Sequence, residues 1–176
     1  INYMRINGKP VKSSRLFLGN EYKLQVQELT KKFNVDENYH KNIDFDYDTY
    51  FEIVKEFKYC FRWKSFSDAN MPEKTHFLYH TFDHAYHQLM IELVQLQVKS
   101  IKQIANIQEI DRLYVDGGFT DNDLYIKLLS YYLRGMKLRT TQASLGSALG
   151  AAIAISDAKL NSKFLKKKEK NIQMFF

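Results

Sequence analysis

The sequence has one cysteine among its 176 residues, no long apolar run and no visible signal peptide. A single thiol, Cys60, excludes an internal disulfide, so a reducing compartment such as the cytoplasm is expected. The longest weakly polar run, Ala148–Ser156, has the length of a core helix, whereas a bilayer span needs about 20 apolar residues. These absences argue against a disulfide-stapled secreted fold and against a membrane-spanning protein.

The composition is that of a globular protein, with 45% hydrophobic and 15% aromatic residues. A chain of this length is long enough for one domain with its own core. Cys60 lies in an aromatic stretch with Phe57, Tyr59, Phe61 and Trp63, which favours a buried structural thiol over a nucleophile. Because the sequence opens at Ile1 and not at a methionine, we expect it to be part of a longer chain.

The net charge of +6 is concentrated near the C-terminus. The lysines that carry much of it are Lys159, Lys163, Lys166, Lys167, Lys168 and Lys170. A basic tail can bind nucleic acid or anionic lipid. No aromatic pattern typical of RNA-binding domains accompanies it, so the favoured interpretation is the solvated face of a terminal helix, with no nucleic-acid or membrane partner.

The first half of the chain predicts a hairpin followed by helices. Asn7-Gly8 between two β-prone segments is a strong signal for a hairpin turn. Apolar residues then recur at helical spacing in two stretches, separated by a polar loop. The expected elements are strands at Tyr3–Ile6 and Pro10–Lys12, a helix at Glu21–Phe33, a loop at Asn34–Asp46 and a helix at Tyr47–Tyr59.

Phe77–Ala105 is the longest predicted helix, and its apolar stripe is expected to pack against a sheet. Four histidines, His76, His80, His84 and His87, fall on roughly one face of it. Histidines four residues apart on a helix can hold a metal. No cysteine or acidic residue completes a known ligand set, so histidines hydrogen-bonded at a packing seam are the favoured interpretation and no metal site is assigned.

The middle of the chain carries a strand, a glycine turn and a helix in direct succession. Ile110–Asp116 is the expected central strand, with Leu113-Tyr-Val pointing into a core. Gly117 and Gly118 follow, and a helix is predicted over Asn122–Leu133. Paired glycines let a ligand approach the backbone closely, and a helix start offers free N–H groups to an anion. A tight turn without a ligand is the alternative that this stretch alone leaves open.

The remaining segments complete an α/β pattern. Gly135 is placed where a helix should stop, and Lys137–Thr140 is predicted to be a short strand. Gln142–Ile155 is predicted to be a helix of small residues, with Gly146 and Gly150 allowing close packing. Strands alternating with helices favour a layered α/β domain. About four strands are expected, fewer than the five or six common in a sheet of this class, so part of the sheet is expected to be missing.

These residues resemble the C-terminal domain of the FGGY carbohydrate kinases, especially the rhamnulokinase and fuculokinase branch. The resemblance covers nearly the whole chain, residues 1–176. It is carried by Asp116-Gly-Gly-Phe-Thr-Asp-Asn122, Ala143-Ser-Leu-Gly-Ser-Ala-Leu-Gly-Ala-Ala152, Gly8-Lys-Pro-Val-Lys-Ser-Ser-Arg-Leu-Phe-Leu-Gly19 and Tyr86-His-Gln-Leu89. Two departures are mild, because Thr120 stands where the family usually has serine and Ser147 where it usually has alanine.

The resemblance implies a fold and a set of nucleotide-binding residues. The fold would be the ribonuclease-H-like, actin-like ATPase domain, a three-layer α/β/α arrangement that is incomplete here and forms the C-terminal half of a two-domain enzyme. Gly118 would give its backbone to the nucleotide, Gly117 would make room and Asn122 would reach the adenine edge. Asp116 is tempting as a catalytic base, but support of the turn is favoured.

The resemblance also implies an activity whose catalytic groups this chain lacks. The parent enzyme would transfer the γ-phosphoryl group of ATP, with Mg²⁺, to the hydroxyl of a ketose of the rhamnulose, fuculose or xylulose type. The family's Asp-x-Gly-Thr phosphate loop and catalytic aspartate belong to the N-terminal domain, and no such loop occurs here. We therefore expect no turnover from the 176-residue chain alone, and measurable ketose phosphorylation by it would contradict this expectation.

Two alternatives come from other functional classes. The first alternative to a kinase part, for which a homodimer is the one protein partner considered, is a non-catalytic nucleotide-binding or regulatory module of the same fold. The other alternative is a nucleic-acid or membrane-surface binder that uses the lysine tail.

Overall fold

The computed structural model describes residues 3–4, 10–65, 70–140 and 170–171. They form a mixed α/β fold with a small sheet. The elements in chain order are β1 (Tyr3–Met4), β2 (Pro10–Val11), α1 (Leu18–Phe33), η1 (Tyr39–Asn42), α2 (Tyr47–Lys55), α3 (Phe82–Ile104), η2 (Ile107–Glu109), β3 (Arg112–Val115), α4 (Asp123–Tyr132), β4 (Lys137–Thr140) and β5 (Lys170–Asn171).

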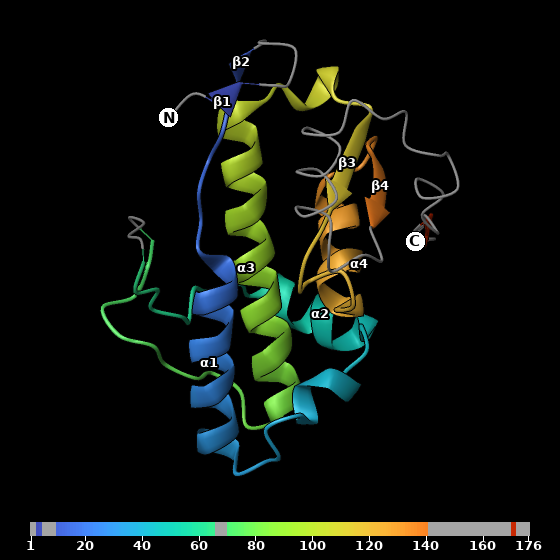
Figure 1. The fold of residues 1–176 in the computed structure, drawn as a ribbon. Helices are drawn as coiled ribbons and strands as arrows, with labels where there is room; N and C mark the ends of the chain where they lie inside the picture. The colour runs from blue at the N-terminus through green and yellow to red at the C-terminus, as the bar shows by residue number, and fades with distance from the viewer. Residues whose placement is uncertain (1–2, 5–9, 66–69, 141–169, 172–176) are drawn as a thin grey trace, which may run out of the picture.

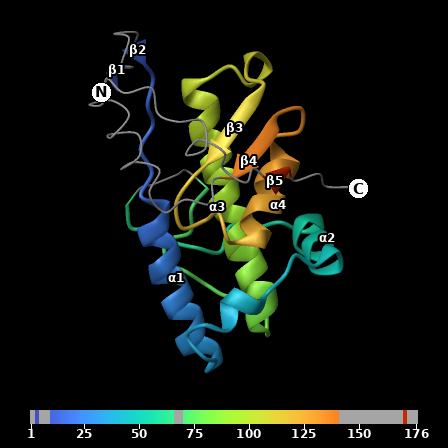
Figure 2. The ribbon, with the colours of Figure 1, turned by 45° about the vertical axis from the view of Figure 1, so that its right-hand side comes forward.

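Helix α3 is the centre of the fold, and α1, α2 and α4 pack around it (Figures 1 and 2). The strands form two separate sheets. The predicted hairpin is confirmed, because β1 pairs with β2 in antiparallel register. In the second sheet, β3 and β4 are parallel, with Leu113 opposite Leu138, and β5 joins β4 in the antiparallel sense. Helix α4 connects the two parallel strands, so β3, α4 and β4 form one βαβ unit.

Side-chain caps set the starts of three helices. Asp46, Thr81 and Asn122 each accept a hydrogen bond from the backbone N–H three residues on, at the starts of α2, α3 and α4. A cap of this kind satisfies one of the N–H groups that the first helical turn leaves unpaired. At its other end, α1 stops at Asn34, which adopts the left-handed conformation with a φ of 53°. Asparagine tolerates this conformation better than most residues.

The cap at Thr81 corrects the predicted start of the long helix. The sequence predicts a helix from Phe77, but α3 begins at Phe82, so His76 and His80 lie outside it. The apolar stripe of α3 is predicted to pack against a sheet. In the structure, the main neighbours of α3 are the helices α1, α2 and α4. The second helix, α2, ends at Lys55, four residues before the predicted end at Tyr59.

Four buried polar side chains hold the extended segment at residues 58–65 against α1 and α3. Glu21 accepts from the backbone N–H groups of Lys64 at 3.0 Å and Ser65 at 2.6 Å, and Glu92 accepts from Cys60 at 2.7 Å and Phe61 at 3.3 Å. The amides of Gln25 and Gln88 donate to the carbonyls of Arg62 and Lys58. Side chains of helices therefore satisfy backbone groups that would otherwise need a neighbouring strand.

Cys60 lies inside this arrangement and is buried, which confirms a structural thiol. Burial raises the pKa of the Cys60 thiol to about 12, and the negative charge of Glu92 adds to the effect. A thiol that stays protonated at neutral pH is a poor nucleophile.

Two further expectations differ from the structure or lie outside its described part. Strand β3 does not point wholly into a core, because Tyr114 is 55% exposed while Leu113 and Val115 pack against the core. Alternation of side chains across the strand explains this difference. The predicted helix at Gln142–Ile155 and most of the lysine tail lie outside the described residues. No helix within the described ranges has the length and apolar character to span a membrane.

Candidate functional site

The glycine turn joins the end of β3 to the start of α4. Gly117 has a φ of 91°, a conformation that L-residues with side chains rarely adopt. Its carbonyl accepts from the backbone N–H of Thr120 at 3.1 Å and from the Thr120 hydroxyl at 2.8 Å. The threonine at this position therefore closes the turn, and the next backbone hydrogen bond, from Asn122 to Phe119, leads into the helix.

The space beside both glycines is open. A Cβ atom built on Gly117 or on Gly118 meets nothing within 4 Å among the described residues. The neighbouring Phe119 does not fill this space, because its ring stacks on Tyr125 with centroids 4.4 Å apart and meets Tyr22 edge-on at 5.3 Å. Phe119 lines a different, more apolar cavity beside β3. Both glycines are exposed, so this open space adjoins the surface, and their contact with a nucleotide stays a prediction.

Gly118 and Asn122 line one cleft, of about 550 Å³, between the start of α4, helix α1 and the segment at residues 40–44. The other residues that line it are Tyr22, His40, Lys41, Ile43, Asp44, Asp121 and Asp123. Gly117 is not among them, so its part is to shape the turn. A volume of this size falls within the range of small-ligand sites, about 300–1,000 Å³.

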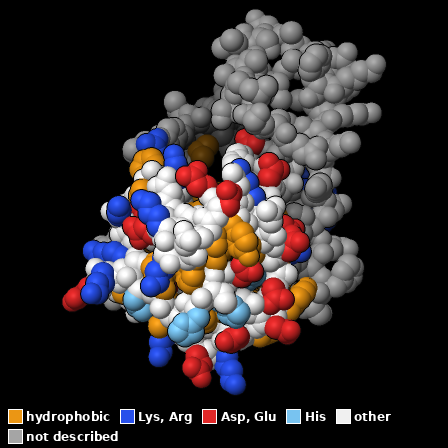
Figure 3. Space-filling model, turned by 90° about the horizontal axis from the view of Figure 1, so that it is seen from below, with side chains coloured by type: hydrophobic (Ala, Val, Ile, Leu, Met, Phe, Trp, Pro, Cys, Tyr) orange, Lys and Arg blue, Asp and Glu red, His pale blue; other side chains and the backbone are white. Residues whose placement is uncertain are grey.

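The cleft has more acidic than basic side chains. Asp44, Asp121 and Asp123 face one lysine, Lys41, and Asp123 also forms an ion pair with Lys127 at 2.6 Å. Burial lowers the pKa of His40, so this imidazole is neutral at pH 7 and adds no positive charge. On the face drawn in Figure 3, basic side chains lie mainly toward the left and carboxylates mainly toward the right.

Asn122 has a structural task as the N-cap of α4. Its Oδ1 accepts from the backbone N–H of Tyr125 at 2.8 Å, and its Nδ2 donates to the Tyr86 hydroxyl at 2.8 Å. The Tyr86 hydroxyl in turn forms a hydrogen bond of 2.8 Å with the Tyr22 hydroxyl. The contact of Asn122 with an adenine edge stays a prediction, and it would have to use hydrogen-bonding capacity that these two contacts leave over.

Asp116 is placed away from this cleft. It lines the apolar cavity beside β3, together with Leu113, Val115 and Phe119. Its position beside the glycine turn fits the predicted supporting role.

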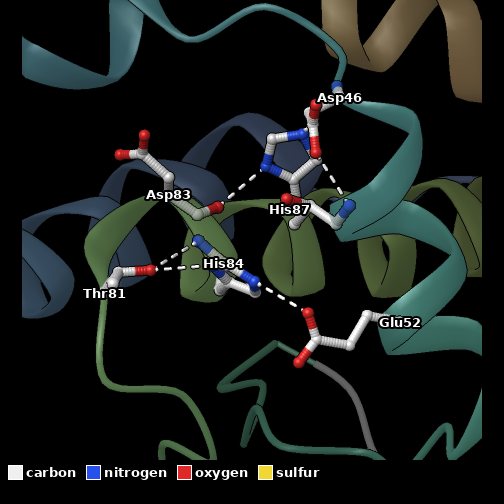
Figure 4. Close-up of polar contacts among 7 residues, drawn as sticks. Asp46, Glu52, Thr81, Asp83, His84 and His87 are labelled. Carbon is white, nitrogen blue, oxygen red and sulfur yellow. Dashed lines mark hydrogen bonds and ion pairs between the residues drawn. The ribbon is translucent and has the colours of Figure 1, made fainter.

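The histidines of α3 serve packing and are not arranged as ligands (Figure 4). His87 is buried, accepts from the backbone N–H of Asp46 at 3.1 Å and pairs its Nδ1 with the Asp83 carbonyl at 2.8 Å. His84 contacts the Thr81 hydroxyl at 2.8 Å and the Glu52 carboxylate at 3.1 Å. Both rings thus link α3 to α2 or to its N-cap, and His84 also contacts the cap of α3. For His84 and His87 this confirms hydrogen-bonded histidines at a packing seam.

No group of three or more His, Cys, Asp or Glu side chains within the described ranges is arranged to hold a metal ion. A carboxylate-rich cleft is therefore not by itself a magnesium site, and no residue of this chain is assigned to Mg²⁺.

Sequence reasoning missed the five residues that reach the Gly118 cleft from the first half of the chain: Tyr22, His40, Lys41, Ile43 and Asp44. Tyr22 lies within a predicted helix, and the other four fall in a segment predicted only as a polar loop. No local motif marks them, because the fold brings them to α4 from more than 70 residues away. A larger cavity of about 610 Å³ lies along α1 on the other side of Tyr22 and His40, and no predicted site residue lines it.

Comparison with known proteins supports the fold and little else. No protein-family model matches the sequence, and no curated protein matches it. Among solved structures, a carbohydrate kinase from Novosphingobium aromaticivorans matches with a TM-score of 0.59. The fold is shared with a carbohydrate kinase. The match covers 98% of this chain at 15% identity, so it shows the fold alone.

The chain spans 35% of the length of that kinase. That the sequence is one part of a larger enzyme stays a prediction. The assignment to the FGGY family, the ribonuclease-H-like topology and the three-layer arrangement remain predictions.

Proposed function

We propose that this chain is the nucleotide-binding part of an ATP-dependent sugar kinase that phosphorylates a ketose. The observation that carries the proposal is the open space at Gly118, in a cleft at the start of α4. A fold shared with a carbohydrate kinase supports it. Gly118 presents its backbone to the ligand, and the positive φ of Gly117 sets the turn that makes this approach possible.

The charge of the cleft indicates which end of the nucleotide it holds. Asp123 is paired with Lys127, which leaves Asp44 and Asp121 against Lys41, and this excess of negative charge disfavours a triphosphate. Carboxylates instead accept hydrogen bonds from the ribose hydroxyls and from the exocyclic amine of adenine. The adenosine end therefore belongs in the Gly118 cleft, and the phosphates point out of it toward groups that this chain does not supply.

This division of the ligand predicts how affinity depends on the number of phosphates. Calorimetric titration of the chain with adenosine, ADP and ATP is expected to give dissociation constants within about fivefold of one another, because exposed charges contribute only about 0–1 kcal/mol each. At lower salt the affinity for ATP should fall relative to that for adenosine, because the repulsion between the carboxylates and the phosphates is less screened.

Binding of ATP without any binding of adenosine would contradict this placement, because it would mean that the phosphates supply the affinity. Titration with ribose 5-phosphate is the matched control, since it offers the sugar and an anion without the base.

A further inference from the structure

Three side chains from three helices form a hydrogen-bonded chain that ends in the Gly118 cleft. It begins at Asn122, the cap of α4, passes through the Tyr86 hydroxyl on α3 and ends at the Tyr22 hydroxyl on α1, with both links at 2.8 Å. Tyr86 is fully buried, whereas Tyr22 is half-buried and lines the cleft. The hydrogen bonds therefore connect a structural cap to a residue that lines the cleft.

The direction of each hydrogen bond follows from Asn122. Its Oδ1 accepts from the backbone N–H of Tyr125, which can only donate, so the amide is fixed with Nδ2 toward Tyr86. The oxygen of Tyr86 must then act as an acceptor. The one proton of Tyr86 is buried and needs an acceptor of its own, and among the described residues the Tyr22 oxygen is the one within reach. Tyr22 thus accepts from Tyr86 and keeps its own proton.

We propose that Tyr22 presents its hydroxyl proton to the Gly118 cleft as the group that selects the ligand. The inference rests on the proposed nucleoside site. It assigns Tyr22 the role of a donor facing a hydrogen-bond acceptor of the ligand, while the carboxylates of Asp44 and Asp121 face its donors.

An adenine nucleoside fits this pattern. Adenine carries acceptor nitrogens at ring positions 1, 3 and 7 and a donor amine, and its ribose carries hydroxyl donors. The relay also makes Tyr22 a better donor, because each hydrogen bond in a chain polarises the next. Burial raises the pKa of Tyr22 above its ordinary value of 10.0, so its proton is present throughout the physiological range.

The test replaces Tyr22 by phenylalanine and pairs this variant with ligands that lack one ring nitrogen. Adenosine and its 1-deaza, 3-deaza and 7-deaza analogues are titrated calorimetrically into the wild-type chain and into Tyr22→Phe. Tyr39→Phe is the matched control, since Tyr39 is 41% exposed and does not line the cleft. Near-identical far-ultraviolet circular dichroism and unfolding midpoints show that the variants are folded.

Tyr22→Phe is expected to weaken adenosine binding about threefold to tenfold, the value of one hydrogen bond, and Tyr39→Phe to leave it unchanged. One deaza analogue should bind the wild type about threefold to tenfold more weakly than adenosine does. That analogue should bind Tyr22→Phe and the wild type with equal affinity, because the hydrogen bond is already absent. Equal adenosine affinity of wild type and Tyr22→Phe would overturn the role of Tyr22 and leave the nucleoside site standing.

If Tyr22→Phe fails to fold, the affinities of the wild type for the three analogues still test the inference. Affinities equal to that for adenosine in all three cases would overturn it. Absence of adenosine binding by the wild type would instead overturn the proposed function, and the role of Tyr22 with it.

Discussion

Replacing Gly118 by valine is expected to remove detectable nucleoside binding and to leave the fold intact. The backbone of Gly118 does not have the positive φ that favours glycine, and a Cβ atom built there meets nothing within 4 Å. The protein itself therefore has room for the new side chain. Its two methyl groups would occupy the space in the Gly118 cleft that the ligand needs. A calorimetric titration with adenosine, beside a thermal unfolding curve, measures both halves of this expectation.

Matched glycine variants separate steric blocking from backbone strain. Gly135→Ala places a Cβ atom at a φ of 96°, away from the cleft, so it should cost roughly 1–2 kcal/mol of stability without changing adenosine affinity. Gly118→Ala should keep stability and show a smaller loss of affinity than Gly118→Val, because its side chain is smaller. Unchanged affinity of Gly118→Val would refute the assignment of the cleft.

Glu92→Ala is expected to destabilise the protein by about 3–5 kcal/mol. The Glu92 carboxylate is fully buried and accepts from the backbone N–H groups of Cys60 and Phe61 and from the Gln88 amide. Alanine would leave the N–H groups of Cys60 and Phe61 buried without an acceptor, would leave the Gln88 amide with only its bond to the Lys58 carbonyl, and would open a cavity. Urea unfolding followed by the fluorescence of the single tryptophan, Trp63, and by circular dichroism measures the loss.

The control for Glu92→Ala is Glu28→Ala on α1, an exposed glutamate whose loss should change stability by no more than about 0.5 kcal/mol. A cost for Glu92→Ala as small as that of the control would show that residues 58–65 do not depend on Glu92.

Burial also raises the pKa of Glu92 to about 7, from an ordinary value of 4.5. Between these two values the folded protein holds a proton that the unfolded chain has lost, so the contribution of Glu92 to stability falls as the pH rises from about 4.5 to 7. His87 acts in the opposite sense. Burial lowers its pKa below 6.5, so its contribution is complete above that value and is lost as the pH falls. Glu92→Gln should leave the rising slope of His87 and that of His40, whose pKa burial also lowers.

Local signals in the sequence were enough to predict the turn and its flanking elements. The strand before the glycine pair and the helix after it, with its apolar spacing, are encoded within about 20 residues, and the structure confirms both elements. The antiparallel pairing of β1 with β2 is local in the same way. Elements of this kind follow from turn chemistry and periodicity alone.

The features that depend on distant partners could not be predicted in this way. Glu21 and Glu92 read as solvent-facing residues of amphipathic helices, yet both are fully buried, because the extended segment at residues 58–65 needs acceptors. Tyr22 lies within a predicted helix, and its use in the cleft depends on Tyr86 and Asn122, 64 and 100 positions further along the chain. Periodicity reports which face of a helix is apolar and carries no information about such pairings.

The most direct test of the nucleoside site is a titration of the ¹⁵N-labelled chain with adenosine, followed by amide chemical shifts. The account predicts saturable shifts that centre on Gly118 and Asn122, extend to Tyr22 and Lys41, and disappear in Gly118→Val. Shifts confined to residues outside the Gly118 cleft, or no shifts at millimolar adenosine, would contradict it.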